Sequence, residues 1–319
     1  MNEPRLETFA VNGIRMRVAI QGEGPLVIFC HGFPECWVSW RRQLQAVSAA
    51  GFRAVAPDMR GYGGSDAPAD PDQYTMLHHV GDMVELVHAL GESQAVIVGH
   101  DWGAPVAWHA ALLRPQVFRA VVGLSVPYSP PADIDLLSAL EKRGVHTFYM
   151  QYFQAPGVAE AELEADVAAT LRKVTWGLSG EGAGGVPGLL GPGAGFLENA
   201  PDPARMPDWL DAADFEHAVG EFRRNGFRGP LNWYRAIRKS HELLTAWRGA
   251  AIGQPALFIG GEKDDVLKFS SSRSGLAQHA ETLPGLRGNH ILEGAGHWIQ
   301  REKAEAVNSL ILEFLGSLR

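Results

Sequence analysis

The stretch AVIVGHDWGAPVAWHAALL, residues 95–113, decides the fold of this 319-residue chain. Its first four residues are apolar and predict a buried strand, and residues 104–113 predict a helix. The pentapeptide between them, Gly99-His100-Asp101-Trp102-Gly103, predicts a sharp strand–turn–helix of the kind called a nucleophile elbow. The usual elbow has the sequence G-x-S-x-G and presents a serine, whereas this one presents the carboxylate of Asp101.

A carboxylate at this position implies a particular kind of chemistry. A free aspartate side chain is ionised at neutral pH, so Asp101 needs no base to remove a proton before it attacks. Attack on an ester or amide gives only an anhydride, so the productive target is a saturated carbon that bears a leaving group. The product is an ester on Asp101, and its hydrolysis requires an activated water and an oxyanion hole. Taken alone, Asp101 fits equally well a strand-end residue that caps the following helix.

The composition is that of an ordinary globular enzyme. Hydrophobic residues make up 46% and charged residues 20% of the chain, and its formal net charge is −8. This acidic balance argues against nucleic acid or an anionic membrane surface as the main partner. Because the first residues are polar and no apolar run approaches the roughly 18 residues of a membrane helix, we predict neither a leader nor a membrane span. We interpret the two cysteines, Cys30 and Cys36, as free thiols and predict a cytoplasmic enzyme.

Strand and helix patterns alternate along most of the chain, which predicts an α/β fold with a mostly parallel, doubly wound sheet. An Asn12-Gly13 turn predicts that the first two strands form an antiparallel hairpin. The alternation stops near residue 128 and resumes near residue 252. We therefore predict a core of residues 1–128 and 252–319 and an inserted helical cap of residues 129–251. The expected strands are residues 6–11, 14–20, 25–30, 53–56, 94–98, 118–124, 256–259 and 290–292, and the expected core helices are residues 37–50, 74–90, 104–113 and 299–318.

Several segments that contain candidate catalytic groups directly follow predicted strands. Open α/β sheets bind ligands at the carboxyl ends of their strands, so these segments are expected to meet in space. The backbone N–H groups of Phe33 and Trp102 stand where hydrolases of this topology have their oxyanion donors. A simple tight turn is the alternative for residues 31–32, and their position directly after a strand favours the oxyanion role.

A histidine and an acid complete the predicted catalytic set. His297 follows the last predicted strand and precedes the final helix, which makes it the best base candidate among the 12 histidines. Asp264 and Asp265 follow the preceding strand and offer the acid that orients the histidine, and because they are adjacent both are candidates. Nucleophile, acid, histidine is the chain order of the triads in this fold. The histidines show no metal-ligand spacing, and no cofactor is implied.

Taken together, these motifs resemble those of the α/β-hydrolase-fold epoxide hydrolases. The chain is similar to the hydrolase domain of the soluble epoxide hydrolases over nearly its whole length. Two cap segments are the most specific part of the resemblance, because generic members of the fold share only the core motifs. The segments that carry it are HGFPE (31–35), DMRGYG (58–63), GHDWG (99–103), YMQYFQAPG (149–157), GFRGPLNWYR (226–235), EKD (262–264) and GHW (296–298).

The resemblance implies a two-step hydrolysis of an epoxide to a vicinal diol through a covalent aspartyl ester. It implies that Asp101 opens the epoxide at carbon, that Tyr149 and Tyr234 hydrogen-bond the epoxide oxygen, and that His297 with its acid activates water. The chemistry agrees with two tyrosines, because a phenol stays protonated at neutral pH and can assist a leaving alkoxide. Packing within the cap is the alternative role for such tyrosines.

The resemblance also bears on the acid and on the substrate. The family's acid matches Asp264, whereas Asp265 stands where the family often has an apolar or aromatic residue. The implied partners are a small-molecule epoxide and water, the implied reaction needs no metal or other cofactor, and the expected role is detoxification. The residues expected to bind substrate are Phe33, Trp102, Tyr149 and Tyr234.

The main competing hypothesis is a haloalkane or haloacid dehalogenase, which would use the same Asp nucleophile and His base. Haloalkane dehalogenases typically have Asn at the position of Phe33, and fluoroacetate dehalogenases typically have Arg at that of Trp102, so both residues favour the epoxide. A binding protein on a degenerate hydrolase scaffold would be expected to lack a member of the triad. A serine esterase is disfavoured because the chain contains no G-x-S-x-G motif.

Overall fold

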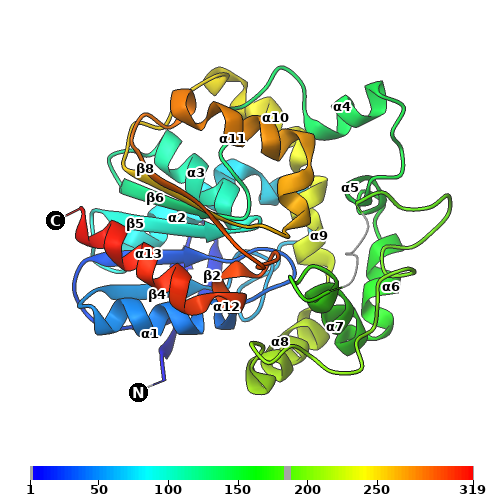
Figure 1. Ribbon diagram of the computed structural model, residues 1–319, viewed down its shortest axis with the longest axis horizontal. Helices are drawn as coiled ribbons and strands as arrows, with labels where there is room; N and C mark the ends of the chain where they lie inside the picture. The colour runs from blue at the N-terminus through cyan, green and yellow to red at the C-terminus, as the bar shows by residue number, and fades with distance from the viewer. Residues whose placement is uncertain (1–2, 183–187, 319) are drawn as a thin grey trace.

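Eight strands form the sheet of the computed structural model, which describes residues 3–182 and 188–318: β1 (Arg5–Val11), β2 (Ile14–Gln21), β3 (Leu26–Cys30), β4 (Arg53–Pro57), β5 (Ala95–His100), β6 (Phe118–Leu124), β7 (Ala256–Gly261) and β8 (Leu286–Leu292). Their order is β1-β2-β4-β3-β5-β6-β7-β8 (Figure 1). β2 is antiparallel to β1 and to β4, and all other neighbours are parallel. The Asn12-Gly13 turn joins β1 to β2 with positive φ at both residues. The predicted α/β fold class is confirmed.

Side chains on the two faces of the sheet belong to two separate apolar layers. Along β3, Ile28 and Cys30 belong to one layer and Val27 and Phe29 to the other, as the two-residue repeat of a strand requires. A parallel strand that is buried on both faces needs an uninterrupted apolar sequence, and β3 has one. This double burial fixes the central strands, whose carboxyl ends carry the functional loops.

Helices cover both faces of the sheet (Figure 1). On one face lie α1 (Arg41–Ala49) and the C-terminal helices α12 (Ile299–Glu302) and α13 (Ala304–Gly316). On the other face lie α2 (Met76–Ala89), α3 (Gly103–Leu113) and α11 (Ser270–Thr282). The arrangement is the doubly wound one that the alternating strand and helix patterns predict.

A helical insertion, defined here as residues 125–255 between β6 and β7, lies mostly on the right in Figure 1. Its described part adds no strand to the sheet and contains one isolated bridge, between Phe148 and Leu189. Along the described residues of the whole chain, no helix is long and apolar enough to cross a membrane. The helices of the insertion are α4 (Leu136–Lys142), α5 (Tyr149–Tyr152), α6 (Val158–Ala165), α7 (Val167–Gly177), α8 (Ala212–Asn225), α9 (Arg228–Arg235), α10 (Ile237–Leu244) and the short η3 (Thr245–Trp247).

Most predicted elements are found with ends shifted by one or two residues, and the larger differences are the following. The helix expected over residues 37–50 is a short 3₁₀ helix, η1 (Trp37–Trp40), followed by α1. The final helix, expected over residues 299–318, is divided into α12 and α13 at Lys303, which has φ −127° and ψ 43°. β8 begins at Leu286 rather than at residue 290. The sequence does not indicate this earlier start, because the edge strand alternates partly buried and exposed residues and lacks an apolar run at its start. The helix α11 was not expected, since its serine-rich first turns carry no clear apolar stripe.

Candidate active site

Asp101 lies on a sharp turn between β5 and α3. Its φ of +51° is in the left-handed region, which residues other than glycine rarely adopt. Small residues on both sides allow the turn, because a Cβ on Gly99 would overlap the carbonyl oxygen of Gly103, and one on Gly103 would overlap that of Cys30. A strained backbone under a reactive side chain is typical of a functional site.

One carboxylate oxygen of Asp101 is bound by the loop after β3. The backbone N–H of Phe33 donates a hydrogen bond of 2.7 Å to Oδ1 of Asp101. The two loops approach so closely that a Cβ on Gly32 would overlap both this Oδ1 and the backbone nitrogen of Trp102. Of the two N–H groups expected to form an oxyanion hole, that of Phe33 binds the Asp101 carboxylate, and the backbone nitrogen of Trp102 lies close to the same Gly32.

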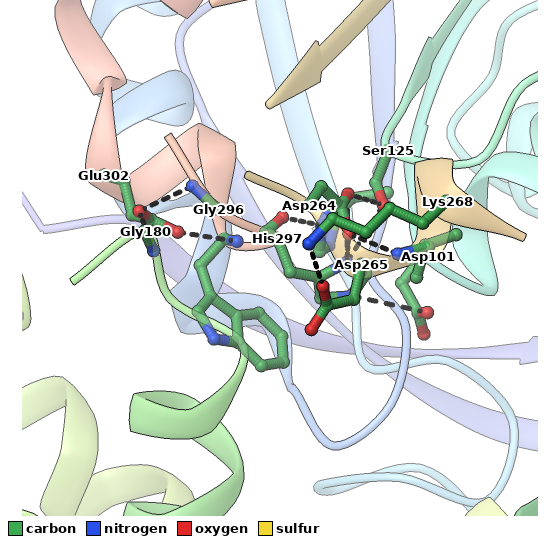
Figure 2. Close-up of polar contacts among 12 residues, drawn as sticks. Asp101, Ser125, Gly180, Asp264, Asp265, Lys268, Gly296, His297 and Glu302 are labelled. Carbon is green, nitrogen blue, oxygen red and sulfur yellow. Dashed lines mark hydrogen bonds and ion pairs between the residues drawn. The ribbon is translucent and has the colours of Figure 1, made fainter. Parts of the chain in front are cut away.

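The other carboxylate oxygen of Asp101 faces a histidine. Nε2 of His297 lies 3.5 Å from Oδ2 of Asp101. On the opposite side of the ring, Nδ1 lies 3.2 Å from Oδ1 and 3.3 Å from Oδ2 of Asp264 (Figure 2). His297 and Asp264 are almost completely buried. The structure thus brings together three predicted residues from the ends of β5, β7 and β8.

Two carboxylates on either side of one imidazole determine its charge. Burial disfavours the charged imidazole, but the negative charges of Asp264 and Asp101 outweigh this effect and raise the pKa of His297 well above its usual range. Burial likewise opposes ionisation of Asp264, yet its contacts with His297, the Ser125 hydroxyl and the Val266 amide lower the pKa of this carboxyl. An ion pair between Asp264 and a protonated His297 follows from these opposite shifts.

The two adjacent aspartates lie in different environments. Asp264 is buried and accepts a hydrogen bond of 2.9 Å from the amide of Val266, in addition to its contacts with His297. The side chain of Asp265 is 37% exposed and forms an ion pair of 2.6 Å with Lys268, in the short helix η4 (Asp265–Lys268). Asp264 therefore contacts the histidine, and Asp265 contacts a surface lysine.

Ser125 is a polar residue of the site that the sequence analysis did not identify. It directly follows β6, is fully buried, and has a φ of +67°. Its Oγ lies 2.5 Å from Oδ2 of Asp264 and 2.9 Å from Nδ1 of His297 (Figure 2). Its position at a strand end was the available signal, because Asp101 and the loop of Asp264 follow neighbouring strands in the same way.

The two candidate tyrosines come from the helical insertion. Tyr149 is the first residue of α5 and Tyr234 lies in α9. Their ring centroids are 6.0 Å apart, and the Tyr234 ring lies 5.1 Å from that of Trp102 and 5.5 Å from that of Phe33. Burial is the main cause that raises the pKa of both phenols, and the nearby Asp101 charge raises it further. Both hydroxyls therefore stay protonated and able to donate.

Two cavities of about 240 Å³ each meet at Asp101 and Tyr149. Apolar and aromatic side chains dominate their walls, as in small-molecule sites generally. Trp102 lines the first cavity, and Phe33, Tyr234 and His297 line the second. The first is further bounded by Pro105, Val126, Leu136, Leu140, Phe148 and Met150, and the second by Val174, Leu178, Phe196 and the ion-paired Asp265 and Lys268.

The His297 loop is attached to the helical insertion. The carboxylate of Glu302 accepts hydrogen bonds from the backbone N–H groups of Gly180, Gly296 and Trp298, at 2.9, 2.9 and 3.0 Å (Figure 2). The backbone N–H of His297 itself donates to the carbonyl of Leu178, at 2.9 Å. The segment after α7 and the histidine loop are thus held as one unit.

A second buried histidine, His100, lies next to His297, with 4.7 Å between the ring centroids. His100 Nδ1 lies 2.9 Å from Glu35 Oε2, and its Nε2 lies 2.7 Å from the carbonyl oxygen of His297. Burial opposes ionisation of Glu35, but the contact with His100 lowers the pKa of this carboxyl to about 2. Among the described residues, no group of three or more His, Cys, Asp or Glu side chains is arranged to hold a metal ion.

Comparisons with known proteins give consistent results. A family model for the alpha/beta hydrolase fold matches residues 25–173. The whole chain is 41% identical to epoxide hydrolase A of Mycobacterium tuberculosis and covers 99% of that protein. It is 38% identical to the bifunctional epoxide hydrolase 2 of Mus musculus over 95% of this chain and 54% of that protein. The solved structure of an epoxide hydrolase from an endophytic Streptomyces matches with a TM-score of 0.96 and 46% identity, over 100% of this chain and 97% of that one.

Proposed function

The chain belongs to the epoxide hydrolases of the α/β-hydrolase fold, and we propose that it hydrolyses epoxides to vicinal diols through a covalent ester on Asp101. The observation that carries the proposal is that the two carboxylate oxygens of Asp101 have different contacts. Oδ1 accepts the Phe33 N–H at 2.7 Å, whereas Oδ2 faces Nε2 of His297 at 3.5 Å, at the junction of the two cavities. We assign Oδ1, which is hydrogen-bonded by the Phe33 N–H, to the oxyanion hole, and Oδ2, which has only the longer contact with His297, to attack on the epoxide.

In the first step, Oδ2 of Asp101 attacks one carbon of the epoxide and the bond from that carbon to the ring oxygen breaks. The ring oxygen takes a proton from a phenol, either Tyr149 or Tyr234, while the other phenol donates a hydrogen bond to it. Buried phenols are suited to this task because they are protonated at neutral pH. The products of the step are a neutral ester and one phenolate.

The second step hydrolyses the ester. His297 accepts a proton from a water molecule, which attacks the Asp101 carboxyl carbon. The negative charge that develops on Oδ1 is stabilised by the N–H groups of Phe33 and Trp102. The bond between that carbon and Oδ2 then breaks, and Oδ2 takes the proton from His297 and leaves as a hydroxyl group of the diol. The water oxygen stays on Asp101, and its remaining proton passes to His297, which restores the carboxylate and the protonated imidazole of the free enzyme.

The charges around His297 explain how one imidazole serves both steps. In the free enzyme it faces two carboxylates, which raise its pKa and keep it protonated. Formation of the ester neutralises Asp101 and removes one of these charges, so the pKa of His297 falls. The proton that the imidazole then releases can restore the phenolate, and the neutral ring becomes the base for water.

We further propose that residues 1–128 and 252–319 form the catalytic core and that residues 129–251 form a cap over the cavity. In this assignment the cap supplies Tyr149 and Tyr234, and the core supplies Asp101, Asp264 and His297. The substrate-binding residues are Phe33, Trp102 and the two tyrosines. The cytoplasmic location and the role in detoxification stay predictions from the sequence.

A single turnover in heavy-oxygen water tests the covalent route. Enzyme in excess over styrene oxide is mixed in H₂¹⁸O, and the diol is analysed by mass spectrometry. We expect unlabelled diol and one ¹⁸O atom on Asp101, located by peptide mapping. Labelled diol would mean that water attacks the epoxide directly, and Asp101 would then not be the nucleophile.

A further inference from the structure

We propose that Ser125 is a positioning residue for ester hydrolysis, whose hydroxyl joins Asp264 to His297 and holds the imidazole with Nε2 directed toward Asp101. The inference rests on the aspartyl-ester mechanism proposed above. It assigns a specific task to a residue that touches neither the predicted substrate nor the reacting atoms.

The contact distances around the imidazole carry the argument. Nδ1 of His297 lies 2.9 Å from Oγ of Ser125 but 3.2 and 3.3 Å from the two oxygens of Asp264. The shortest contact of this nitrogen is therefore to the serine. Oγ also lies 2.5 Å from Oδ2 of Asp264, so the three side chains form a closed triangle (Figure 2).

The hydrogen atoms can be assigned from chemistry alone. An ionised Asp264 only accepts hydrogen bonds, so the Ser125 hydroxyl donates to it. The lone pairs of Oγ are then free to accept, and both neighbours of Nδ1 are acceptors. In the neutral ring the proton therefore stays on Nδ1, and Nε2 keeps the lone pair that must take a proton from water.

The backbone gives a second, independent observation. Ser125 has a φ of +67°, where glycine is the least strained residue, yet a serine is present. Its N–H donates to the carbonyl of Ile259 in β7, at 3.0 Å, so the strand end is fixed beside the loop of Asp264. A strained conformation that is held by the neighbouring strand and presents a buried hydroxyl is the pattern of a functional residue.

Several ionisable groups surround His297 and share in its titration. Asp264 and Asp101 face its two nitrogens, and the ring of His100 lies 4.7 Å away between centroids. The Glu302 carboxylate binds the flanking amides of the same loop. Removal of the hydroxyl from Ser125 leaves Asp264 less stabilised as an anion, so the Asp264–His297 pair binds a proton more readily. The acidic limb of ester hydrolysis is then expected at higher pH.

The test uses Ser125→Ala and Ser125→Gly together. Both lack the hydroxyl, but only glycine relieves the left-handed backbone, so the two variants differ in thermal stability and are alike in hydrogen bonding. Each variant is mixed with excess styrene oxide and quenched in acid, and the ester on Asp101 is quantified by intact mass. We expect both to hydrolyse the ester about ten-fold more slowly, the size of one lost hydrogen bond to a charged group.

The remaining readouts separate positioning from stability. Alkylation should stay within about two-fold of wild type, so the ester accumulates and kcat and KM fall together. The acidic limb should move to higher pH in both variants. Ser125→Asn, which tolerates positive φ and carries both a donor and an acceptor, should recover part of the rate. Wild-type ester hydrolysis in both the Ala and Gly variants, or rates that follow their melting temperatures, would overturn the proposal.

A separate measurement keeps this test distinct from that of the covalent route. If the wild-type enzyme forms no ester, the proposed mechanism is wrong. The contact between Ser125 and His297 is then tested separately, by the NMR signal of the His297 Nδ1–H proton. We expect that signal to shift in both variants and its titration to move to higher pH. An unchanged signal would mean that the hydroxyl does not hold the imidazole.

Discussion

Two parts of the candidate active site, which we call the floor and the roof, are held in place by different interactions. We define the floor as Asp101, Ser125, Asp264 and His297, which follow four strands, and the roof as Tyr149 and Tyr234 of the helical insertion. In the floor each polar group lies within hydrogen-bond or ion-pair distance of another. In the roof the contacts are between aromatic rings, with Tyr234 at 5.0 Å from Phe153 and Tyr149 at 5.5 Å from the same ring.

This difference predicts two kinds of response to substitution. The floor is a connected set of charges in a buried site, so loss of one member changes the state of the others. The roof is held by ring packing, so removal of a hydroxyl leaves the ring and its packing in place. Substitution of a charged floor residue is expected to slow one step by several orders of magnitude, whereas loss of a hydroxyl from Ser125 or from a roof tyrosine is expected to slow one step by only about 10- to 100-fold.

The largest expected effect is that of Asp101→Asn. The amide has no anionic oxygen to attack carbon, so ester formation should be lost and turnover should fall by about 10⁴-fold or more. The removal of one carboxylate charge should also lower the pKa of His297, because that charge stabilises the imidazolium. Intact-mass analysis after mixing with styrene oxide and NMR titration of the imidazole measure the two effects. An ester that still forms would contradict the assigned nucleophile.

Asp264→Asn should strongly slow hydrolysis of the ester and leave its formation unchanged. The amide keeps the shape of the side chain but can no longer stabilise a protonated His297, and an amide in place of a triad acid costs about 10⁴-fold in the serine proteases. We expect ester hydrolysis to slow by about 10³- to 10⁴-fold and the ester to accumulate to nearly one equivalent. A variant that turns over at the wild-type rate would remove Asp264 from the triad.

In the roof, Tyr149→Phe and Tyr234→Phe should each slow alkylation by about 10- to 100-fold, and the double variant by more. Each change removes only a hydroxyl, so ring contacts and thermal stability should be retained. Ester hydrolysis, measured separately after rapid mixing, should change little. If either single variant loses activity as completely as Asp101→Asn, the roof is not a pair of assisting donors, and the contrast with the floor fails.

The floor and the roof also differ in how far the sequence predicts them. The sequence predicts that Asp101, Asp264 and His297 come together, because Asp101 and Asp264 follow strands with apolar runs, His297 follows the short apolar end of β8, and parallel strands bring such residues to one edge. Ser125 occupies an equivalent position, but the sequence does not single it out, because serine at a strand end is common and its proposed role depends on a distance between side chains. Its contact with Nδ1 arises from the register of β6 against β7, which the sequence does not state.

Tyr149 and Tyr234 could not be derived from local patterns. They are 85 positions apart along the chain, lie on short helices of the insertion, and meet only through tertiary packing. Only the resemblance to a family pointed to them. The insertion as a whole was recognisable as a break in strand–helix alternation, whereas the anchoring of its Gly180 by Glu302 depends on loop geometry.

The smallest expected effect comes from Asp265→Asn, the matched control for Asp264→Asn. The same chemical change is made one residue further along, at a side chain that is 37% exposed and paired with Lys268. Exposed ion pairs contribute roughly 0–1 kcal/mol to stability, so the melting temperature should change little and kcat should stay within about two-fold of wild type. Both variants are measured under identical conditions. The difference between their rates of ester hydrolysis then separates the effect of the contact between Asp264 and His297 from the effect of negative charge in this loop. If the Asp265 variant accumulates ester, the negative charge of Asp265 also contributes to the function of His297, and the direct contact with Asp264 is not sufficient.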